Sequence, residues 1–214
     1  MTPALGLLFL AGGGTTSPEV ARAFLDAAGR ERLIIVIGQA RQDPARASGS
    51  HDFLIQHGAK FVVVWPWTNP TDEDRDQAEE MLKQAGGIWI PGGDQNLVLD
   101  RFGTDWCRRV FGEARRRGTA FFGTSAGAML MSDQMIAGYG ESQQTAEIRR
   151  GFGLIDITVD THFSQREREP RLRFSLKQTG VKTGIGLDEN EWVMIDSDNK
   201  IHPGQGEATI IKQN

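Results

Sequence analysis

The sequence predicts a three-layer α/β fold, in which a mostly parallel sheet is covered by helices on both faces. Short apolar runs alternate with helical patterns through the first two thirds of the 214 residues, which is typical of β-α-β units. Hydrophobic residues make up 39% and charged residues 24% of the chain, the balance of a globular protein with a full core. We therefore expect a single domain that spans residues 1–214.

Each expected element is bounded by residues that suit its ends. The apolar runs predict buried strands at 5–11, 33–37, 61–65, 88–90 and 120–122. Helical patterns lie between them at 18–28, 72–84 and 105–117, with a weaker one near 52–56. The predicted N-caps are Thr71 and Thr104, and the predicted C-terminal stops are Gly86 and Gly118.

The pattern changes after about Met135. Residues 138–153 are polar and contain glycine, which indicates a surface loop or a short hairpin. A strand is expected at 154–159 and a helix at 171–178. The two last apolar runs, 191–195 and 208–212, are joined by the turn-rich segment 196–206. We expect these two runs to pair with each other as antiparallel strands.

A serine between two glycines follows the strand at 120–122. The run Gly123-Thr124-Ser125-Ala126-Gly127 has the G-x-S-x-G pattern of a nucleophile elbow, in which a sharp strand-to-helix turn exposes the serine hydroxyl. The flanking residues must be small because the turn is strained and a neighbouring backbone approaches closely. The Ala126 N–H, at the start of the next helix, would point towards an oxyanion. Ser125 is therefore the candidate nucleophile.

A serine nucleophile needs a base, and the chain has four histidines. His51 and His57 lie in a polar connection, where a solvated or locally bonded histidine is the better interpretation. His162 follows the strand expected at 154–160 and can reach a site along the sheet edge. Together with the elbow, this position favours His162 as the base that takes the hydroxyl proton and returns it to the leaving amine.

The base needs a carboxylate to orient it. Asp188 and Glu189 follow the short apolar segment 184–187. Consecutive side chains of an extended segment point in opposite directions, so only one of the two can face His162. The residues alone do not choose between them.

Two glycine clusters and an arginine run complete the candidates. The first cluster, Gly12-Gly13-Gly14, has Ser17 where a dinucleotide-binding G-x-G-x-x-G has its third glycine, so we do not favour a dinucleotide site. The second cluster lies in residues 90–95 and could supply a second oxyanion donor, although an ordinary strand-to-helix turn is an equally good interpretation. Guanidinium groups near the base could hold an acidic substrate group; they belong to Arg166, Arg168 and Arg171.

Four separated blocks resemble the family of serine peptidases that includes cyanophycinase and aspartyl dipeptidase (peptidase E). The motifs "GTSAGA" and "HFSQR" are the most specific, and the cyanophycinase branch is the more similar. The blocks cover the chain nearly from end to end: 12–14, 91–95, 123–128, and 160–166 with 184–190. The resemblance implies a fold like that of class I glutamine amidotransferases (flavodoxin-like), with antiparallel strands added near the C-terminus.

The resemblance also implies roles for individual residues. It makes Ser125 the nucleophile, His162 the base and Glu189 its orienting partner. The implied oxyanion hole is formed by backbone groups at Gly93 or Asp94 and at Ala126. The implied substrate-binding residues are Gln95, Thr161, Arg166, Arg168 and Arg171. Thr161 stands where cyanophycinases usually have Gln, and the chain is shorter than theirs.

These residues predict a serine peptidase that cleaves peptides or dipeptides after an aspartyl residue, α- or β-linked, through an acyl-enzyme. One alternative is an α/β-hydrolase esterase with the order serine, acid, histidine. It would use His202 as base, with Asp188, Asp196 or Asp198 as the acid. Another alternative is a binding module without catalysis on the same scaffold.

Composition excludes several other classes. The net charge of −4 gives no reason to expect a nucleic acid, and no apolar run approaches the roughly 20 residues of a membrane span. The single cysteine, Cys107, excludes an intrachain disulfide and a cysteine-based metal cluster. We expect a cytoplasmic enzyme with no cofactor and no metal, since the histidines lack ligand spacing. Its expected partner is a peptide or dipeptide substrate, and the sequence leaves open whether the chain forms a homodimer.

Overall fold

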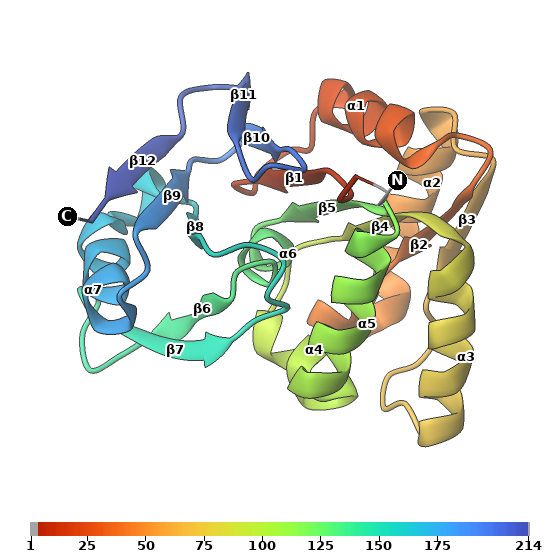
Figure 1. Ribbon diagram of the computed structural model, residues 1–214, viewed down its shortest axis with the longest axis horizontal. Coiled ribbons are helices and arrows are strands. Elements are labelled where there is room, and N and C mark those ends of the chain that lie inside the picture. Colours follow the sequence, from red (N-terminus) through yellow and green to blue (C-terminus); the bar gives the residue numbers. More distant parts are fainter. Residues whose placement is uncertain (1–3, 214) are drawn as a thin grey trace.

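A seven-stranded sheet forms the centre of the molecule, shown as a computed structural model whose described residues are 4–213 (Figure 1). Its strands are β1 (Leu8–Ala11), β2 (Leu33–Val36), β3 (Phe61–Val64), β4 (Ala85–Ile90), β5 (Ala120–Thr124), β10 (Trp192–Ile195) and β11 (Ile201–Gln205). Their order is β11-β10-β1-β5-β4-β2-β3. Strands β1 to β5 are mutually parallel, and β10 and β11 are added antiparallel at one edge.

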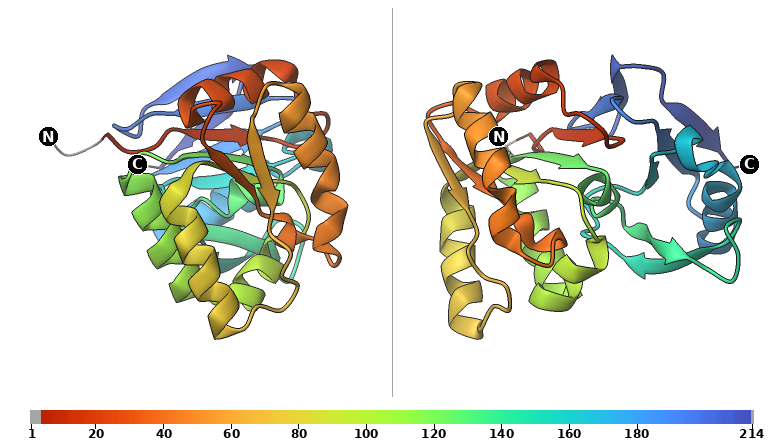
Figure 2. Two further views of the ribbon diagram at one scale, coloured as in Figure 1. Left: turned by 90° about the vertical axis from the view of Figure 1, so that its right-hand side faces the viewer. Right: turned by 180° about the vertical axis from the view of Figure 1, so that it is seen from behind.

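Helices cover both faces of this sheet (Figure 2). One face packs against α1 (Pro18–Ala28) and α2 (Ser48–Gln56), and the other against α3 (Asp72–Gln84), α4 (Gln95–Phe102) and α5 (Thr104–Arg116). Successive side chains of a strand point to opposite faces. Along β1, Leu8 and Leu10 enter one core, whereas Phe9 and Ala11 enter the other. The expected three-layer α/β fold with a mostly parallel sheet is therefore confirmed.

A smaller sheet stands beside the first, on the left of Figure 1. It contains β8 (Thr158–Thr161), β9 (Thr183–Leu187) and β12 (Thr209–Lys212), in the order β12-β9-β8. Helix α7 (Glu169–Thr179) contacts β8 and β9. Before this sheet, β6 (Gln134–Tyr139) and β7 (Ala146–Arg150) form a hairpin, where the sequence predicts a loop or hairpin at 138–153.

The helix-end residues predicted from the sequence are confirmed in part. Thr71 forms a capping box with Asp74 at the start of α3, and Gly118 after α5 has a φ of 88°. The N-cap of α5 is Gly103, so Thr104 is its first helical residue and not its cap. Gly86 does not end α3 but lies inside β4, where a Cβ atom would come within 2.2 Å of the Ala28 carbonyl oxygen.

The expected pairing of the last two strands is wrong. β10 pairs with β11, with Met194 opposite His202, and β12 pairs with β9, with Ile210 opposite Ile185. The chain reverses directly after β10, because the Asp196 carboxylate accepts hydrogen bonds from the N–H groups of Asp198 and Lys200. Proline and glycine in 203–204 mimic a turn signal, but they are tolerated in β11 because it is an edge strand.

None of the helices within residues 4–213 has both the length and the apolar character that crossing a membrane requires.

Candidate active site

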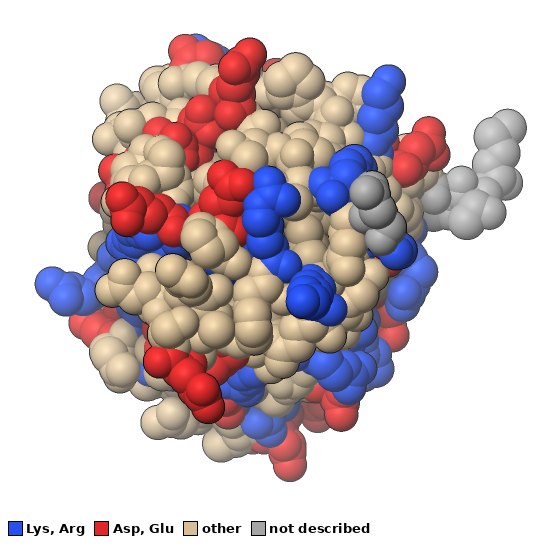
Figure 3. Space-filling view, turned by 90° about the vertical axis from the view of Figure 1, so that its left-hand side faces the viewer, with Lys and Arg blue, Asp and Glu red and all other residues tan. Residues whose placement is uncertain are grey.

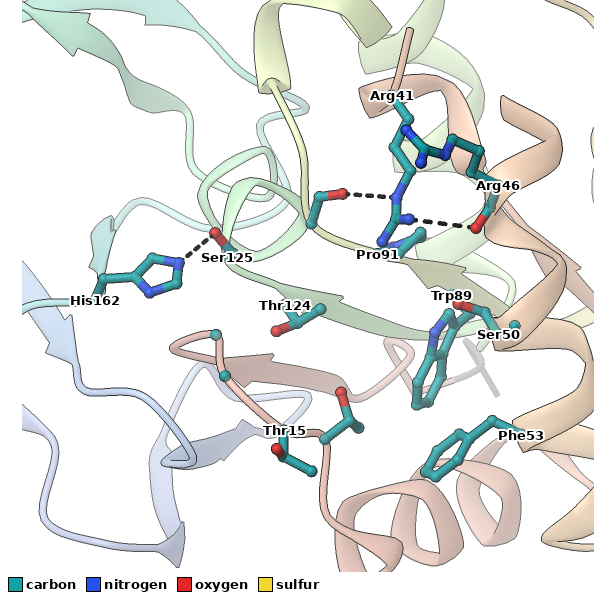
Figure 4. A pocket seen from close by; sticks show the side chains of 15 residues that line it. Thr15, Arg41, Arg46, Ser50, Phe53, Trp89, Pro91, Thr124, Ser125 and His162 are labelled. Carbon is teal, nitrogen blue, oxygen red and sulfur yellow. Dashed lines mark hydrogen bonds between the residues drawn. The ribbon is translucent and has the colours of Figure 1, made fainter. Parts of the chain in front are cut away.

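A pocket of about 570 Å³ opens at the carboxyl ends of β1, β5 and β4 (Figure 4). These three strands are neighbours in the sheet, and ligands of open α/β sheets bind outside the carboxyl ends of the strands. Ser125 and His162 line one side of the pocket, and Arg41, Arg46 and Trp89 line the other. The pocket thus contains the candidate nucleophile and base together with two arginines.

Ser125 has the backbone conformation of a nucleophile elbow. It follows β5 and precedes the short helix α6 (Ala126–Met129), with a φ of 53° and a ψ of −120°. A Cβ atom at Gly123 would lie 2.3 Å from the Gly127 carbonyl oxygen, and one at Gly127 would lie 2.1 Å from that of Ile90. The expectation that the flanking residues must be small because a neighbouring backbone approaches closely is confirmed.

Three side chains from three different turns form one hydrogen-bonded row. Ser125 Oγ lies 2.8 Å from His162 Nε2, and His162 Nδ1 lies 2.7 Å from Glu189 Oε1. In the tautomer with its proton on Nδ1, His162 donates to the carboxylate and accepts from the hydroxyl. The imidazole is largely buried at 14% exposure, whereas Glu189 is 40% exposed. The geometry allows proton transfer from Ser125 to His162.

Asp188 points away from His162. Its carboxylate accepts hydrogen bonds from the N–H and the hydroxyl of Ser164, at the start of the 3-10 turn Ser164–Arg166. The two consecutive acids therefore face opposite ways, as the sequence predicts. Of the pair, the structure brings Glu189 to the imidazole, while Asp188 holds the segment after His162.

The glycines after β1 support the histidine. The His162 N–H donates to the Gly12 carbonyl oxygen at 2.9 Å, and a Cβ atom at Gly13 would lie 2.3 Å from His162 Cε1. Asn190 donates its N–H to the Gly13 oxygen, and its side-chain oxygen accepts the N–H of Thr15. The glycine cluster thus holds both the histidine and the turn that carries Glu189, a role that the sequence reasoning missed.

Backbone donors lie around the serine hydroxyl. Ala126 is the first residue of α6, so its N–H has no acceptor within the helix. The loop after β4 passes beside the hydroxyl, since a Cβ atom at Gly92 would lie 3.8 Å from Ser125 Oγ. The Asp94 N–H already donates to the Ala40 oxygen at 2.7 Å, which corrects its expected role. Gly93 and Ala126 remain candidates for the oxyanion hole.

The residues expected to bind substrate do not line this pocket. Gln95 donates to the Ile136 and Ala137 carbonyl oxygens, and the buried Thr161 hydroxyl contacts the sulfur of Met129. Buried ion pairs join Asp160 to Arg168 and Arg171, and burial lowers the pKa of the Arg168 guanidinium. Arg166 is exposed in the turn after His162. The contacts of Gln95, Thr161, Arg168 and Arg171 are structural, and the assignment of these residues and Arg166 to substrate binding stays a prediction.

The pocket contains groups that the sequence reasoning missed. Arg41 and Arg46 come from the connection between β2 and α2. The signal that could have found them is topological: this connection follows a parallel strand and so begins at the same edge of the sheet as the elbow. A single arginine in a polar loop carries no such signal by itself.

The other histidines are engaged elsewhere. His51 lies beside Asp52, and His57 contacts the Phe53 carbonyl oxygen. His202, the base required by the esterase alternative, lies 2.6 Å from Asp196 Oδ2, and this hydrogen bond lowers the pKa of Asp196. It belongs to β11, three strands from β5. The structure therefore offers His202 no contact with Ser125.

A serine in a strained turn, bonded to a histidine that is bonded to a carboxylate, on an α/β scaffold, is the arrangement of serine hydrolases. Residues 8–202 match the model of a protein family described as "Peptidase family S51". The chain belongs to this family and is a serine-type peptidase.

Individual relatives agree with this family. A cyanophycinase from Nostoc sp. is 28% identical over 202 residues, which cover 90% of this chain and 68% of that protein. A cyanophycinase from Geminocystis herdmanii is 30% identical over 196 residues, covering 86% and 71%.

Two solved structures have the same fold. The crystal structure of a peptidase from an acI-B1 Actinobacterium has a TM-score of 0.71 at 20% identity, covering 98% of this chain and 88% of that one. A putative peptidase E protein from Listeria monocytogenes EGD-e has a TM-score of 0.65 at 14% identity, covering 99% and 100%.

Proposed function

We propose that this peptidase hydrolyses the peptide or isopeptide bond that follows an aspartyl residue, through an acyl-enzyme on Ser125. The observation that carries the proposal is the row of hydrogen bonds from Ser125 through His162 to Glu189. The substrate class is supported by the similarity to cyanophycinases and by the two arginines in the pocket. We further propose that residues 1–214 act as one peptidase domain.

Each group in the row has a separate task in the proposed reaction. Ser125 Oγ attacks the carbonyl carbon while His162 Nε2 takes the hydroxyl proton. Glu189 holds the imidazole in position and stabilises its positive charge. The N–H groups of Ala126 and Gly93 would donate to the oxygen that becomes negative. His162 then gives its proton to the leaving amine, and an acyl ester remains on Ser125.

Water completes the cycle in the second half of the reaction. His162, neutral again, takes a proton from a water molecule that attacks the ester carbonyl carbon. Collapse of the tetrahedral intermediate breaks the bond to Ser125 Oγ, which recovers its proton from His162. The acidic product then leaves, and the hydrogen-bonded row returns to its starting state.

Replacing Ser125 tests this proposal. Ser125→Ala removes the nucleophile and is expected to lower kcat by at least about 10³-fold without loss of the fold. Hydrolysis of β-Asp-Arg and of α-linked aspartyl dipeptides, followed by chromatography of the products, measures the effect. The control is Ser142→Ala in the exposed turn of the β6–β7 hairpin, which should cleave like the wild type.

Covalent labelling gives an independent readout. A phosphonofluoridate should add to Ser125 in the folded protein, and mass spectrometry should find the added mass on the peptide that contains the elbow. Full activity of Ser125→Ala would refute the proposed mechanism. Failure of the probe to label Ser125 would instead favour a binding module without catalysis.

A further inference from the structure

Two arginines form the wall of the pocket across from His162 (Figure 4). Arg41 follows the 3-10 turn Gly38–Ala40, and Arg46 lies in the next turn, Pro44–Ala47. Both line the same pocket as Ser125. No ion pair within residues 4–213 includes either guanidinium group.

Backbone carbonyl groups hold Arg41 in place. Its Nε donates to the Gly92 oxygen at 3.3 Å, and its Nη1 donates to the Arg46 oxygen at 3.2 Å. Among the described residues, Nη2 has no acceptor. Because Gly92 lies directly beside Ser125, these contacts tie the guanidinium group to the loop next to the nucleophile.

The acidic residues nearest in sequence to Arg41 and Arg46 have other hydrogen-bond partners. Asp43 accepts the N–H of Ala45, and Asp52 pairs with His51. The wall formed by Arg41 and Arg46 therefore carries two positive charges, and within residues 4–213 neither guanidinium group forms an ion pair with a carboxylate. Such a wall attracts anionic ligands into the cleft, and guanidinium groups match the geometry of a carboxylate.

We propose that Arg41 and Arg46 form the subsite for the second carboxylate of the aspartyl residue whose other carboxyl group Ser125 attacks. This inference rests on the proposed function. An aspartyl residue in an α-linked peptide keeps its side-chain carboxylate free, and in a β-linked peptide it keeps its α-carboxylate free. One anionic subsite beside the nucleophile can hold either group, so the same pocket accepts both linkages.

The arginines of the smaller sheet do not offer an equivalent subsite. Arg168 and Arg171 are committed to Asp160, so their charge is partly neutralised inside the protein. The face of the molecule over α7 and β12 shows both signs of charge among uncharged surface (Figure 3). Within residues 4–213, the wall near Ser125 places two arginines that form no ion pair in the same cavity as the proposed nucleophile.

Pairs of substrates that differ by one carboxylate test the subsite. The α-linked pair is Asp-Leu and Asn-Leu, and the β-linked pair is β-Asp-Arg and β-alanyl-arginine. The wild type should prefer the acidic member of each pair, measured as the ratio of kcat/KM values. In Arg46→Gln that preference should fall roughly ten- to a hundredfold, while cleavage of the neutral member stays within about twofold.

Matched variants separate the subsite from other effects. Arg22→Gln, the same change at an exposed ion pair with Glu19 on α1, should keep the wild-type ratio. Arg41→Gln should also lower the ratio, and it should slow the neutral substrates if the contact with Gly92 positions the loop. An unchanged ratio in both pocket variants, or an equal loss for acidic and neutral substrates in Arg46→Gln, would overturn the subsite.

Binding of substrates to the Ser125→Ala variant distinguishes failure of the proposed function from failure of the proposed subsite. Calorimetry with Asp-Leu and Asn-Leu should show tighter binding of the acidic dipeptide, and the difference should disappear when Arg46→Gln is added. If the wild type cleaves none of the four substrates but this binding difference is found, the proposed function fails and the subsite stands. If cleavage occurs and the binding difference is absent, the subsite alone fails.

Discussion

At the scale of residues, three residues in and around the site have strained backbone conformations. Ser125, His162 and Asn190 have φ values of 53°, 49° and 66°, a region that residues with a side chain seldom adopt. Each such residue costs about 1–3 kcal/mol, and the surrounding structure must enforce it. The bonds of His162 and Asn190 to the carbonyl groups of Gly12 and Gly13 provide that enforcement. The strained backbone therefore coincides with the proposed catalytic residues and with the turn that supports them.

Gly13 gives a test at this scale. Gly13→Ala would place a methyl group 2.3 Å from the His162 ring at a φ of 109°, so the imidazole must move. A displacement of about 1 Å can cost about 10² in rate, and we expect kcat to fall by about that factor. Steady-state kinetics checks the effect. Gly112→Ala in α5, whose added Cβ has only ordinary contacts, should have no effect, and normal kcat in Gly13→Ala would contradict the role.

At the scale of elements, a buried ion network fastens α7 to the smaller sheet. Asp160 at 0% exposure pairs with Arg171 at 2% and with Arg168. The guanidinium carbons of the two arginines lie 4.4 and 5.5 Å from the ring centre of Tyr139, on β6. One carboxylate and one aromatic ring thus join α7, β8 and the β6–β7 hairpin. This network fixes the strand that ends next to His162.

Removing the central charge of this network should destabilise the protein. Asp160→Asn leaves two buried guanidinium groups without their carboxylate, a change that costs about 3–5 kcal/mol. For a chain of this size we expect the melting temperature to fall by roughly 10 °C, measured by circular dichroism. Arg173→Gln breaks only the exposed pair with Glu169 and should shift it by less than about 2 °C. Equal shifts in the two variants would contradict the network's importance.

At the scale of the whole molecule, sheet order separates the two histidine candidates. His202 lies on β11, at the far edge of the seven-stranded sheet, and β11 is three strands from β5. At about 4.8 Å per strand, this separation is on the order of 14 Å. No side-chain movement can bridge that distance while the sheet is intact.

The histidine variants test this topology. His162→Ala should lower kcat by about 10³-fold or more, because the base is lost. His202→Ala should cleave aspartyl dipeptides at close to the wild-type rate, and it should lose only the contact with Asp196. The opposite pattern, with activity lost only in His202→Ala, would restore the esterase alternative.

The parallel strands and the elbow were predictable because their signals are local. Apolar runs mark β1 to β5, and the glycines around Ser125 mark a turn that only small residues allow. The partner of β12 was not predictable, since edge strands are paired by contacts far apart in sequence. The arginine wall was missed for a similar reason: only the assembled sheet shows that the connection after β2 reaches the elbow.

The choice between the two consecutive acids shows the same limit. Alternation in an extended segment predicts that only one faces the histidine, but not which one. That choice is made by the turn after β9. There the Asp188 carboxylate accepts the N–H of Ser164, and Asn190, with a φ of 66°, donates its N–H to the Gly13 carbonyl oxygen. The decisive contacts come from segments more than 20 residues away, as the Asp188–Ser164 pair illustrates.

The hydrogen-bonded row from Ser125 to Glu189 joins two sheets that share no strand. Ser125 follows a strand of the seven-stranded sheet, whereas His162 and Glu189 follow strands of the smaller one. The glycine loop after β1 connects the two sheets, since its Gly12 and Gly13 carbonyl oxygens accept hydrogen bonds from the N–H groups of His162 and Asn190, in two turns of the smaller sheet. Ser125 and His162 are therefore aligned by the packing of the smaller sheet against the larger one, in a hydrophobic core that includes Phe121 of β5 and Ile185 of β9, and a change in this packing would alter the distance between the two side chains.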